Sequence, residues 1–155
     1  MRLREVAGDL DGRGLHIGVA ASTFNAVITE GLVAGALRAL EAMGVEQVTV
    51  LQVAGALEVP LAARRLVDTG CDAVVAIGAV IRGETDHYRH VATESAAGLR
   101  SVSLETGIPV TNAILTVREF EQARDRSQPG PGNKGYEAAE AAVATVKALR
   151  ALRVD

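Results

Sequence analysis

An uninterrupted apolar run from Ala73 to Val80 constrains the fold more than any other part of the chain. A strand covered by helices on both faces has this pattern, whereas a strand with one face in water alternates apolar and polar residues. The run is therefore predicted to be a buried strand of a parallel sheet. At its carboxyl end, where open α/β sheets bind ligands, Ile81–His87 presents an arginine, a glycine, a hydroxyl, two acids and a histidine.

Strand-like and helix-like segments alternate along the chain, which predicts a four-stranded parallel sheet with right-handed crossovers. With helices on both faces, the expected fold is a three-layer α/β/α sandwich. The expected strands cover residues 15–21, 47–53, 73–80 and 110–115. Four of the expected helices cover 26–43, 88–106, 117–125 and 134–152. Another, between the second and third strands, has Pro60 in its first turn and ends at Gly70. For the helix over 117–125, Thr116 is the expected N-cap, with Glu119 at capping-box spacing.

Composition restricts the class of protein. A length of 155 residues without an obvious linker predicts one domain over residues 1–155. A net charge of −3 provides no electrostatic attraction to nucleic acid. No membrane-length apolar segment or signal-peptide core is evident, so a cytoplasmic protein is expected. A single cysteine, Cys71, excludes an intrachain disulfide and a zinc site built on cysteine pairs, and we interpret it as a small semi-buried side chain.

Three loops at the expected strand ends carry candidate binding residues. Phe24 either stacks on a flat ring or serves as a hydrophobic staple, and the residues alone favour the staple. Glu58 either accepts hydrogen bonds from a polyol or favours the dipole of the helix that it precedes. The backbone N–H groups of Gly83, Glu84 and Thr85 are placed to hold an anion, as at other helix N-termini.

Ionisable side chains supply the candidates for chemistry. A histidine near a helix start is often only a polar surface residue, but the residues around His87 favour a functional role. An unperturbed histidine has a pKa of roughly 6.5, which suits proton transfer. His90 lies three residues on, but the pattern offers no further metal ligands, and no metal is expected. Arg126 and Lys134 flank a Pro/Gly loop, and they form either a phosphate clamp or a solvated charged loop.

Taken together, these motifs resemble those of lumazine synthase, the penultimate enzyme of riboflavin biosynthesis. The resemblance runs from the first strand to the last helix, and the order and spacing of the motifs make it specific. The matching motifs are Phe24-Asn25, Gly55-Ala56-Leu57-Glu58-Val59-Pro60, Val80-Ile81-Arg82-Gly83-Glu84-Thr85-Asp86-His87-Tyr88, Pro109-Val110, Leu115-Thr116, Glu121-Gln122-Ala123, Arg126 and Gly132-Asn133-Lys134-Gly135.

The resemblance implies a flavodoxin-like sheet and a condensation that needs no cofactor. In it, 5-amino-6-(D-ribitylamino)uracil joins 3,4-dihydroxy-2-butanone 4-phosphate to give 6,7-dimethyl-8-ribityllumazine, phosphate and water. Family members form pentamers, decamers or icosahedral shells, with each site between neighbouring subunits. Residues 1–8 would add a strand to a neighbour's sheet. The implied partners are the two substrates and further copies of the chain, not nucleic acid or membrane.

The resemblance also implies a role for each candidate. His87 would move protons, while the loop from Gly83 to Thr85 would hold the phosphate opposite Arg126 and Lys134 of another subunit. The pyrimidine and its ribityl chain would be bound by Phe24, Asn25, Ala56, Leu57, Glu58, the backbone of Val80 and Ile81, and Asn112.

A few positions depart from the family pattern and keep alternatives open. Arg89 stands where an acid is usual, and Asn112 stands where many members carry an aromatic. Pro129 and Pro131 occupy the loop where shell-forming members often have a Gly-Thr-Lys-like run. The alternatives are a non-catalytic lumazine-binding or shell-forming paralogue and the related pentameric riboflavin synthase of archaea. A receiver domain is discounted, because no acidic cluster follows the first strand.

Overall fold

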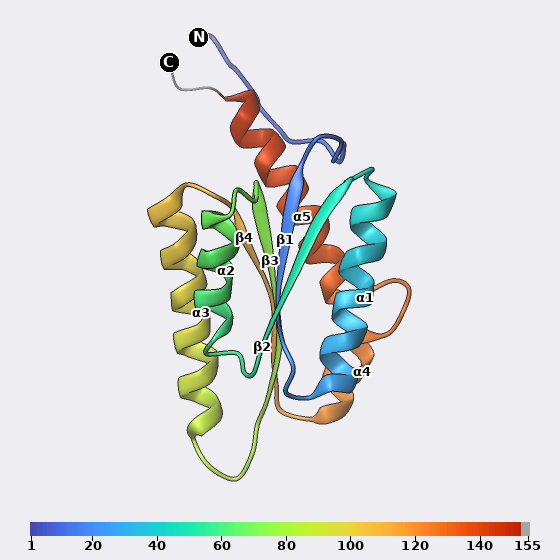
Figure 1. Cartoon of the computed structure of the whole chain (residues 1–155), viewed down its shortest axis with the longest axis vertical. Coiled ribbons are helices and arrows are strands. Elements are labelled where there is room, and N and C mark those ends of the chain that lie inside the picture. Colours follow the sequence, from blue (N-terminus) through green and yellow to red (C-terminus); the bar gives the residue numbers. More distant parts are fainter. Residues whose placement is uncertain (153–155) are drawn as a thin grey trace.

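The computed structural model describes residues 1–152, and residues 153–155 lie outside the described part of the chain. Four parallel strands form one sheet in the order β2-β1-β3-β4, with helices on both of its faces (Figure 1). The predicted three-layer α/β/α sandwich is confirmed. The strands are β1 His16–Ser22, β2 Gln47–Val53, β3 Ala73–Ile81 and β4 Val110–Val117. The helices are α1 Ala26–Ala42, α2 Val59–Asp68, α3 His87–Thr106, α4 Phe120–Ser127 and α5 Lys134–Ala151.

The apolar run forms the central strand, as predicted. β3 pairs with β1 on one side and β4 on the other, and eight of its nine residues are buried. One core lies between the sheet and α1, α4 and α5, and a second core lies between the sheet and α2 and α3. Because both faces of β3 are covered, its side chains are apolar without alternation.

The start of α4 differs from the prediction. Thr116 is not its N-cap, because Thr116 still lies in β4, where it pairs with Val80 of β3. The N-cap is Glu119, which forms a capping box with Gln122. Gln122 Oε1 accepts the backbone N–H groups of Arg118 and Glu119 at 3.0 and 3.1 Å. The strand therefore outlasts the predicted boundary because its ladder with β3 continues to Val117.

The single thiol lies at the amino end of the sheet, away from the strand-end loops. Cys71 is 3% exposed, so this small side chain is more deeply buried than the semi-buried position expected. Burial raises the pKa of the Cys71 thiol, and a protonated thiol is a poor nucleophile. The fold brings His16 close, with Nε2 at 3.7 Å from Cys71 Sγ and 2.8 Å from Thr49 Oγ1.

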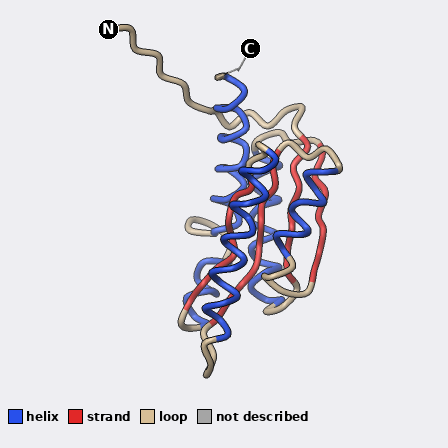
Figure 2. Tube along the Cα trace, turned by 90° about the vertical axis from the view of Figure 1, so that its left-hand side faces the viewer, coloured by secondary structure: helices blue, strands red, loops and turns tan. Residues whose placement is uncertain are grey.

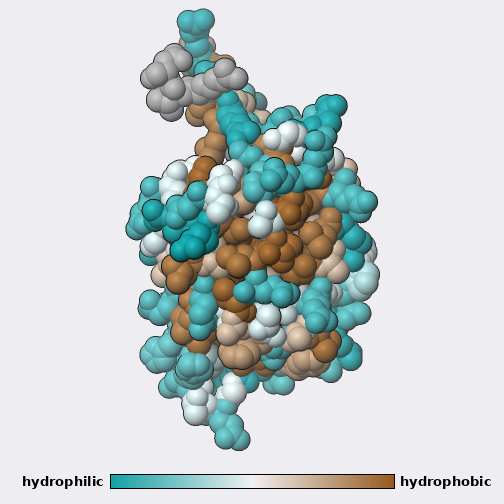
Figure 3. All heavy atoms as spheres, in the orientation of Figure 1, coloured by the Kyte–Doolittle hydropathy of each residue, from teal (hydrophilic) through white to brown (hydrophobic). Residues whose placement is uncertain are grey.

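An exposed segment and an exposed sheet edge remain outside these cores. Residues 1–10 run beyond the sheet beside the end of α5 (Figure 2). β2 forms an edge of the sheet, and each of its residues is exposed or half-buried. Figure 3 shows apolar side chains gathered near the centre of the face that β2 crosses. No helix in residues 1–152 is long and apolar enough to cross a membrane.

Candidate functional site

A cavity of ≈ 360 Å³ lies where the loops at the carboxyl ends of β1, β2 and β3 meet. Its wall is mainly aliphatic and aromatic, with a few polar side chains, which is the usual character of a small-molecule site. The lining residues are Phe24, Asn25, Gly55, Ala56, Leu57, Glu58, Ala79, Val80, Ile81, His87, Tyr88 and Val91. The fold therefore brings together eight of the predicted site residues from three separate loops.

The loop between β1 and α1 presents an aromatic ring to this cavity. Phe24 is 63% exposed, and a Cβ added to Gly55 would lie 3.1 Å from its ring, so the ring rests on the neighbouring loop. Asn25 has a left-handed backbone with φ 59°, and its Nδ2 donates to Ala79 O at 3.1 Å. The Asn25 amide thus ties this loop to the end of β3, and the exposed ring fits the stacking interpretation better than a staple.

The loop between β2 and α2 presents a carboxylate. Glu58 is the N-cap residue of α2, and its Oε2 accepts the backbone N–H of Gly55 at 3.1 Å. Pro60 lies in the first helical turn, as predicted. A carboxylate has two oxygens with several acceptor sites, so Glu58 keeps capacity for ligand hydroxyl groups after this internal bond.

The loop between β3 and α3 ends on the candidate proton carrier. His87 is the first residue of α3 and lines the cavity, and its backbone N–H donates to Thr85 Oγ1 at 3.4 Å. Gly83, Glu84 and Thr85 are exposed and lie beside the cavity rather than in its wall. Asp86 occupies the N-cap position without a side-chain capping bond. The first turn of α3 therefore keeps N–H groups for an anion.

Arginine side chains surround Tyr88 at the edge of the cavity. The Arg82 guanidinium lies 5.8 Å from the centre of the Tyr88 ring, and Arg89 Nε donates to the Tyr88 hydroxyl at 3.5 Å. The hydrogen bond from Arg89, with the nearby charges of Arg82 and Arg118, lowers the pKa of Tyr88. Arg89 thus adds positive charge directly after the His87–Tyr88 pair.

Besides Gly83, Glu84 and Thr85, three further predicted site residues do not line the cavity of their own chain. Asn112 is exposed on β4, and its Oδ1 accepts the Ile114 N–H at 2.8 Å. Arg126 lies on α4 and donates to Gln122 O at 3.0 Å. Lys134 begins α5 and pairs with Glu137 at 2.8 Å. α4 and α5 cover the face of the sheet opposite α2 and α3 (Figure 1).

Sequence reasoning missed four residues of the cavity wall, namely Gly55, Ala79, Tyr88 and Val91. A signal existed for two of them. Tyr88 directly follows His87, and Val91 lies one helical turn after it, so all three belong to the start of α3.

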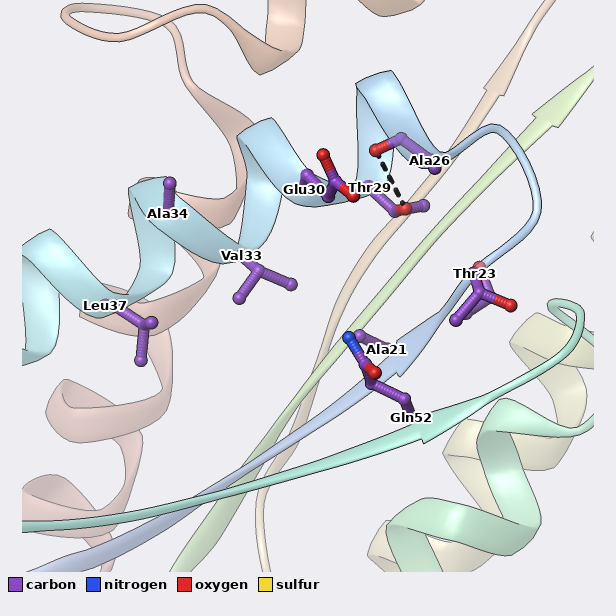
Figure 4. A pocket seen from close by; sticks show the side chains of 10 residues that line it. Ala21, Thr23, Ala26, Thr29, Glu30, Val33, Ala34, Leu37 and Gln52 are labelled. Carbon is purple, nitrogen blue, oxygen red and sulfur yellow. Dashed lines mark hydrogen bonds between the residues drawn. The ribbon is translucent and has the colours of Figure 1, made fainter.

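A second hollow, of ≈ 230 Å³, lies between α1 and β2 (Figure 4). Its lining contains Glu30 as the single ionisable side chain, and the Thr29 hydroxyl donates to Ala26 O at 3.4 Å. Within residues 1–152, no group of three or more metal-ligating side chains is placed to hold a metal ion. This hollow thus offers one carboxylate and no histidine, whereas the cavity at the strand ends combines Glu58 with His87.

Fold and cavity together define an α/β protein with a cavity of small-molecule size at the carboxyl ends of its strands. The family model described as 6,7-dimethyl-8-ribityllumazine synthase matches residues 14–150. A relative from Thermococcus gammatolerans named 6,7-dimethyl-8-ribityllumazine synthase is 44% identical over 140 residues, which cover 90% of each chain. The chain belongs to the 6,7-dimethyl-8-ribityllumazine synthase family, whose members are transferases of riboflavin biosynthesis.

Proposed function

We propose that this chain condenses 5-amino-6-(D-ribitylamino)uracil with 3,4-dihydroxy-2-butanone 4-phosphate to give 6,7-dimethyl-8-ribityllumazine, phosphate and two molecules of water. The observation that carries the proposal is a cavity that combines an exposed aromatic ring, a carboxylate and a histidine at a helix start. These are the groups that a pyrimidine, a polyol and a proton transfer need.

The pyrimidine and its ribityl chain occupy the part of the cavity nearest β1 and β2. The Phe24 ring stacks on the pyrimidine, and backbone groups of Val80 and Ile81 bind its edge. Asn25 holds the loop against β3 through its bond to Ala79 O. Glu58 accepts hydrogen bonds from ribityl hydroxyl groups, while Ala56 and Leu57 fill the apolar wall.

The phosphate of the butanone lies at the start of α3. Backbone N–H groups of Gly83, Glu84 and Thr85 and the first turn of the helix donate to its oxygens. The open space around Gly83 supports this placement of the phosphate, because a Cβ added to Gly83 would meet no atom within 4 Å. A carboxylate would repel the phosphate, so in this arrangement Glu84 contributes only its backbone N–H.

His87 carries protons between the two bound substrates. The amine of the pyrimidine attacks the butanone ketone, and the hydroxyl that forms must gain a proton before it leaves as water. Loss of phosphate and ring closure then require further proton transfers in the same space. A neutral imidazole accepts a proton at one step and returns it at another. Holding both substrates together supplies much of the remaining rate without a cofactor.

A neighbouring subunit completes the site. Asn25, Glu58 and His87 are all exposed in the single chain, whereas a condensation that expels water gains from a covered site. Arg126 and Lys134 lie outside the cavity of their own chain, and their contacts with Gln122 O and Glu137 are exposed, where a neighbour's phosphate site can replace them. The Arg126 fork binds the departing phosphate, Lys134 assists, and Asn112 contributes a polar part of the wall around the ring.

The edge of β2 receives residues 1–8 of a neighbour as an added strand. An unpaired edge strand offers a row of N–H and C=O groups to such a segment. Val50 is 41% exposed on β2, and the first ten residues of the chain are themselves exposed. The proposed assembly is a ring of five subunits, or a larger particle built from such rings.

Sedimentation in phosphate buffer is expected to give a species of five times 16.1 kDa or a multiple of that mass. Removal of residues 1–8 is expected to shift the distribution toward smaller species, because the added strand is lost. A monomer formed by the full-length chain would contradict the proposed assembly.

A single domain over residues 1–155 and a cytoplasmic location stay predictions from the sequence.

Product formation tests the proposed reaction. Purified protein, supplied with both substrates and a chelator but no nucleotide, is expected to form the lumazine chromophore. Absence of product at high enzyme concentration would leave a non-catalytic lumazine-binding or shell-forming paralogue as the better description. Formation of riboflavin from the lumazine alone would instead identify the related riboflavin synthase activity.

A further inference from the structure

We propose that Asn133 is a positioning residue that fixes Arg126 and Lys134 relative to each other and to α1. The proposal rests on the proposed function, in which these two cations complete a neighbouring subunit's phosphate site. Asn133 is 1% exposed and is the N-cap residue of α5, directly before Lys134. It lies at the end of the Pro/Gly loop that separates the two cations.

The Asn133 amide joins three segments of the chain. Its Nδ2 donates to Gly31 O at 3.2 Å, to Ser127 O at 3.2 Å and to Gln128 O at 3.0 Å. Its Oδ1 accepts the Tyr136 N–H at 3.0 Å, which caps α5. An amide has two hydrogens, so two of the three carbonyl groups share one of them. One buried side chain thus connects α1, the end of α4 and the start of α5.

The loop itself offers little to hold the cations in place. Gly130 and Gly132 both have positive φ, at 101° and 88°, and the Asn133 N–H meets Gly130 O only at 3.4 Å. Arg126 directly precedes Ser127, whose carbonyl oxygen Asn133 binds. The side chain of Asn133 therefore spans the loop and sets the separation of the two cation-bearing backbones.

Glycines on α1 create the space for this connection. A Cβ on Gly35 would overlap the Asn133 amide, and a Cβ on Gly31 would overlap the carbonyl oxygen of Ser127. Glycine within a helix is unfavourable, and here it allows close approach of a polar side chain. α1 begins directly after Phe24 and Asn25, so the same helix frames the chain's own cavity and the cations offered to its neighbour.

The kinetic test uses Asn133→Asp and Gly35→Ala. Asn133→Asp keeps an acceptor for the Tyr136 N–H but removes the donors to the three carbonyl groups. Gly35→Ala keeps Asn133 but displaces its amide from the α1 side. Both are expected to raise the KM for the butanone phosphate by roughly tenfold or more, because displacing the phosphate-binding cations by about 1 Å has large kinetic effects. The KM for the pyrimidine is expected to change less than about twofold, a selectivity that general destabilisation would not produce.

Gly18→Ala is the matched control, because a Cβ there would press on Leu66 and Cys71 toward the amino end of the sheet, remote from the cations and from the strand-end cavity. It is expected to lower the melting temperature without the selective change in KM. Equal changes for both substrates, or an unchanged KM for the butanone in a folded variant, would overturn the proposal. Failure of both variants to fold would make Asn133 a folding residue and would also overturn it. Failure of the proposed function is distinguishable, because the wild-type protein would then form no lumazine.

Discussion

His87→Ala is expected to lower kcat for lumazine formation by about a hundredfold, while the KM of each substrate changes little. The imidazole lies in the cavity wall at the start of α3, where it reaches the reacting atoms but leaves most binding contacts to other residues. The variant is expected to keep part of the rate enhancement, because the cavity still holds the two substrates together. Steady-state absorbance at saturating concentrations of both substrates measures the effect.

His90→Ala provides the control for this substitution. His90 lies on the same helix, three residues further along, and does not line the cavity. Its removal is expected to leave kcat within about twofold, since a general acid–base role requires contact with the reacting groups. An unchanged kcat in His87→Ala would remove His87 from the mechanism.

Arg126→Ala is expected to lower kcat/KM for the butanone phosphate by roughly a hundredfold, because a planar guanidinium binds phosphate oxygens through charge-assisted hydrogen bonds. The KM for the pyrimidine is expected to stay nearly constant. Varying each substrate at a saturating concentration of the other separates the two effects.

Arg124→Ala is the control for loss of charge on α4. Arg124 lies two residues before Arg126 and is engaged by Glu121 at 2.6 Å. Its removal lowers the local positive charge as much as Arg126→Ala does, but it is expected to leave kcat/KM for the butanone phosphate unchanged. A loss confined to the pyrimidine in Arg126→Ala would show that the phosphate assignment is wrong.

The central strand and the cavity were predictable because their signals are local. The apolar run of β3 reflects coverage on both faces, and parallel strands place their carboxyl ends at one edge of the sheet. Candidates such as Phe24, Glu58 and His87, from three loops, could therefore be expected to meet there. The start of α4 was mispredicted, because pairing between β4 and β3 outweighed the capping preference of Thr116.

Other features depend on contacts that sequence spacing does not reveal. His16 and Cys71 meet only because β1 and β3 are adjacent in the sheet. The three bonds from Asn133 require the backbones of α1 and the end of α4 to approach one side chain. The motif identified Asn133 as part of a family pattern, but its physical role appears only in the packing of these segments.

Mixed assemblies of His87→Ala and Arg126→Ala subunits test the central claim, a site shared between neighbouring copies, most directly. Each variant alone is expected to be nearly inactive. In rings co-assembled from equal amounts of the two, about a quarter of the sites would pair an intact His87 with an intact Arg126. Recovery of about that fraction of wild-type activity is the predicted result. Mixed assemblies no more active than the separate variants would contradict the account, because each chain would then use its own His87 and Arg126.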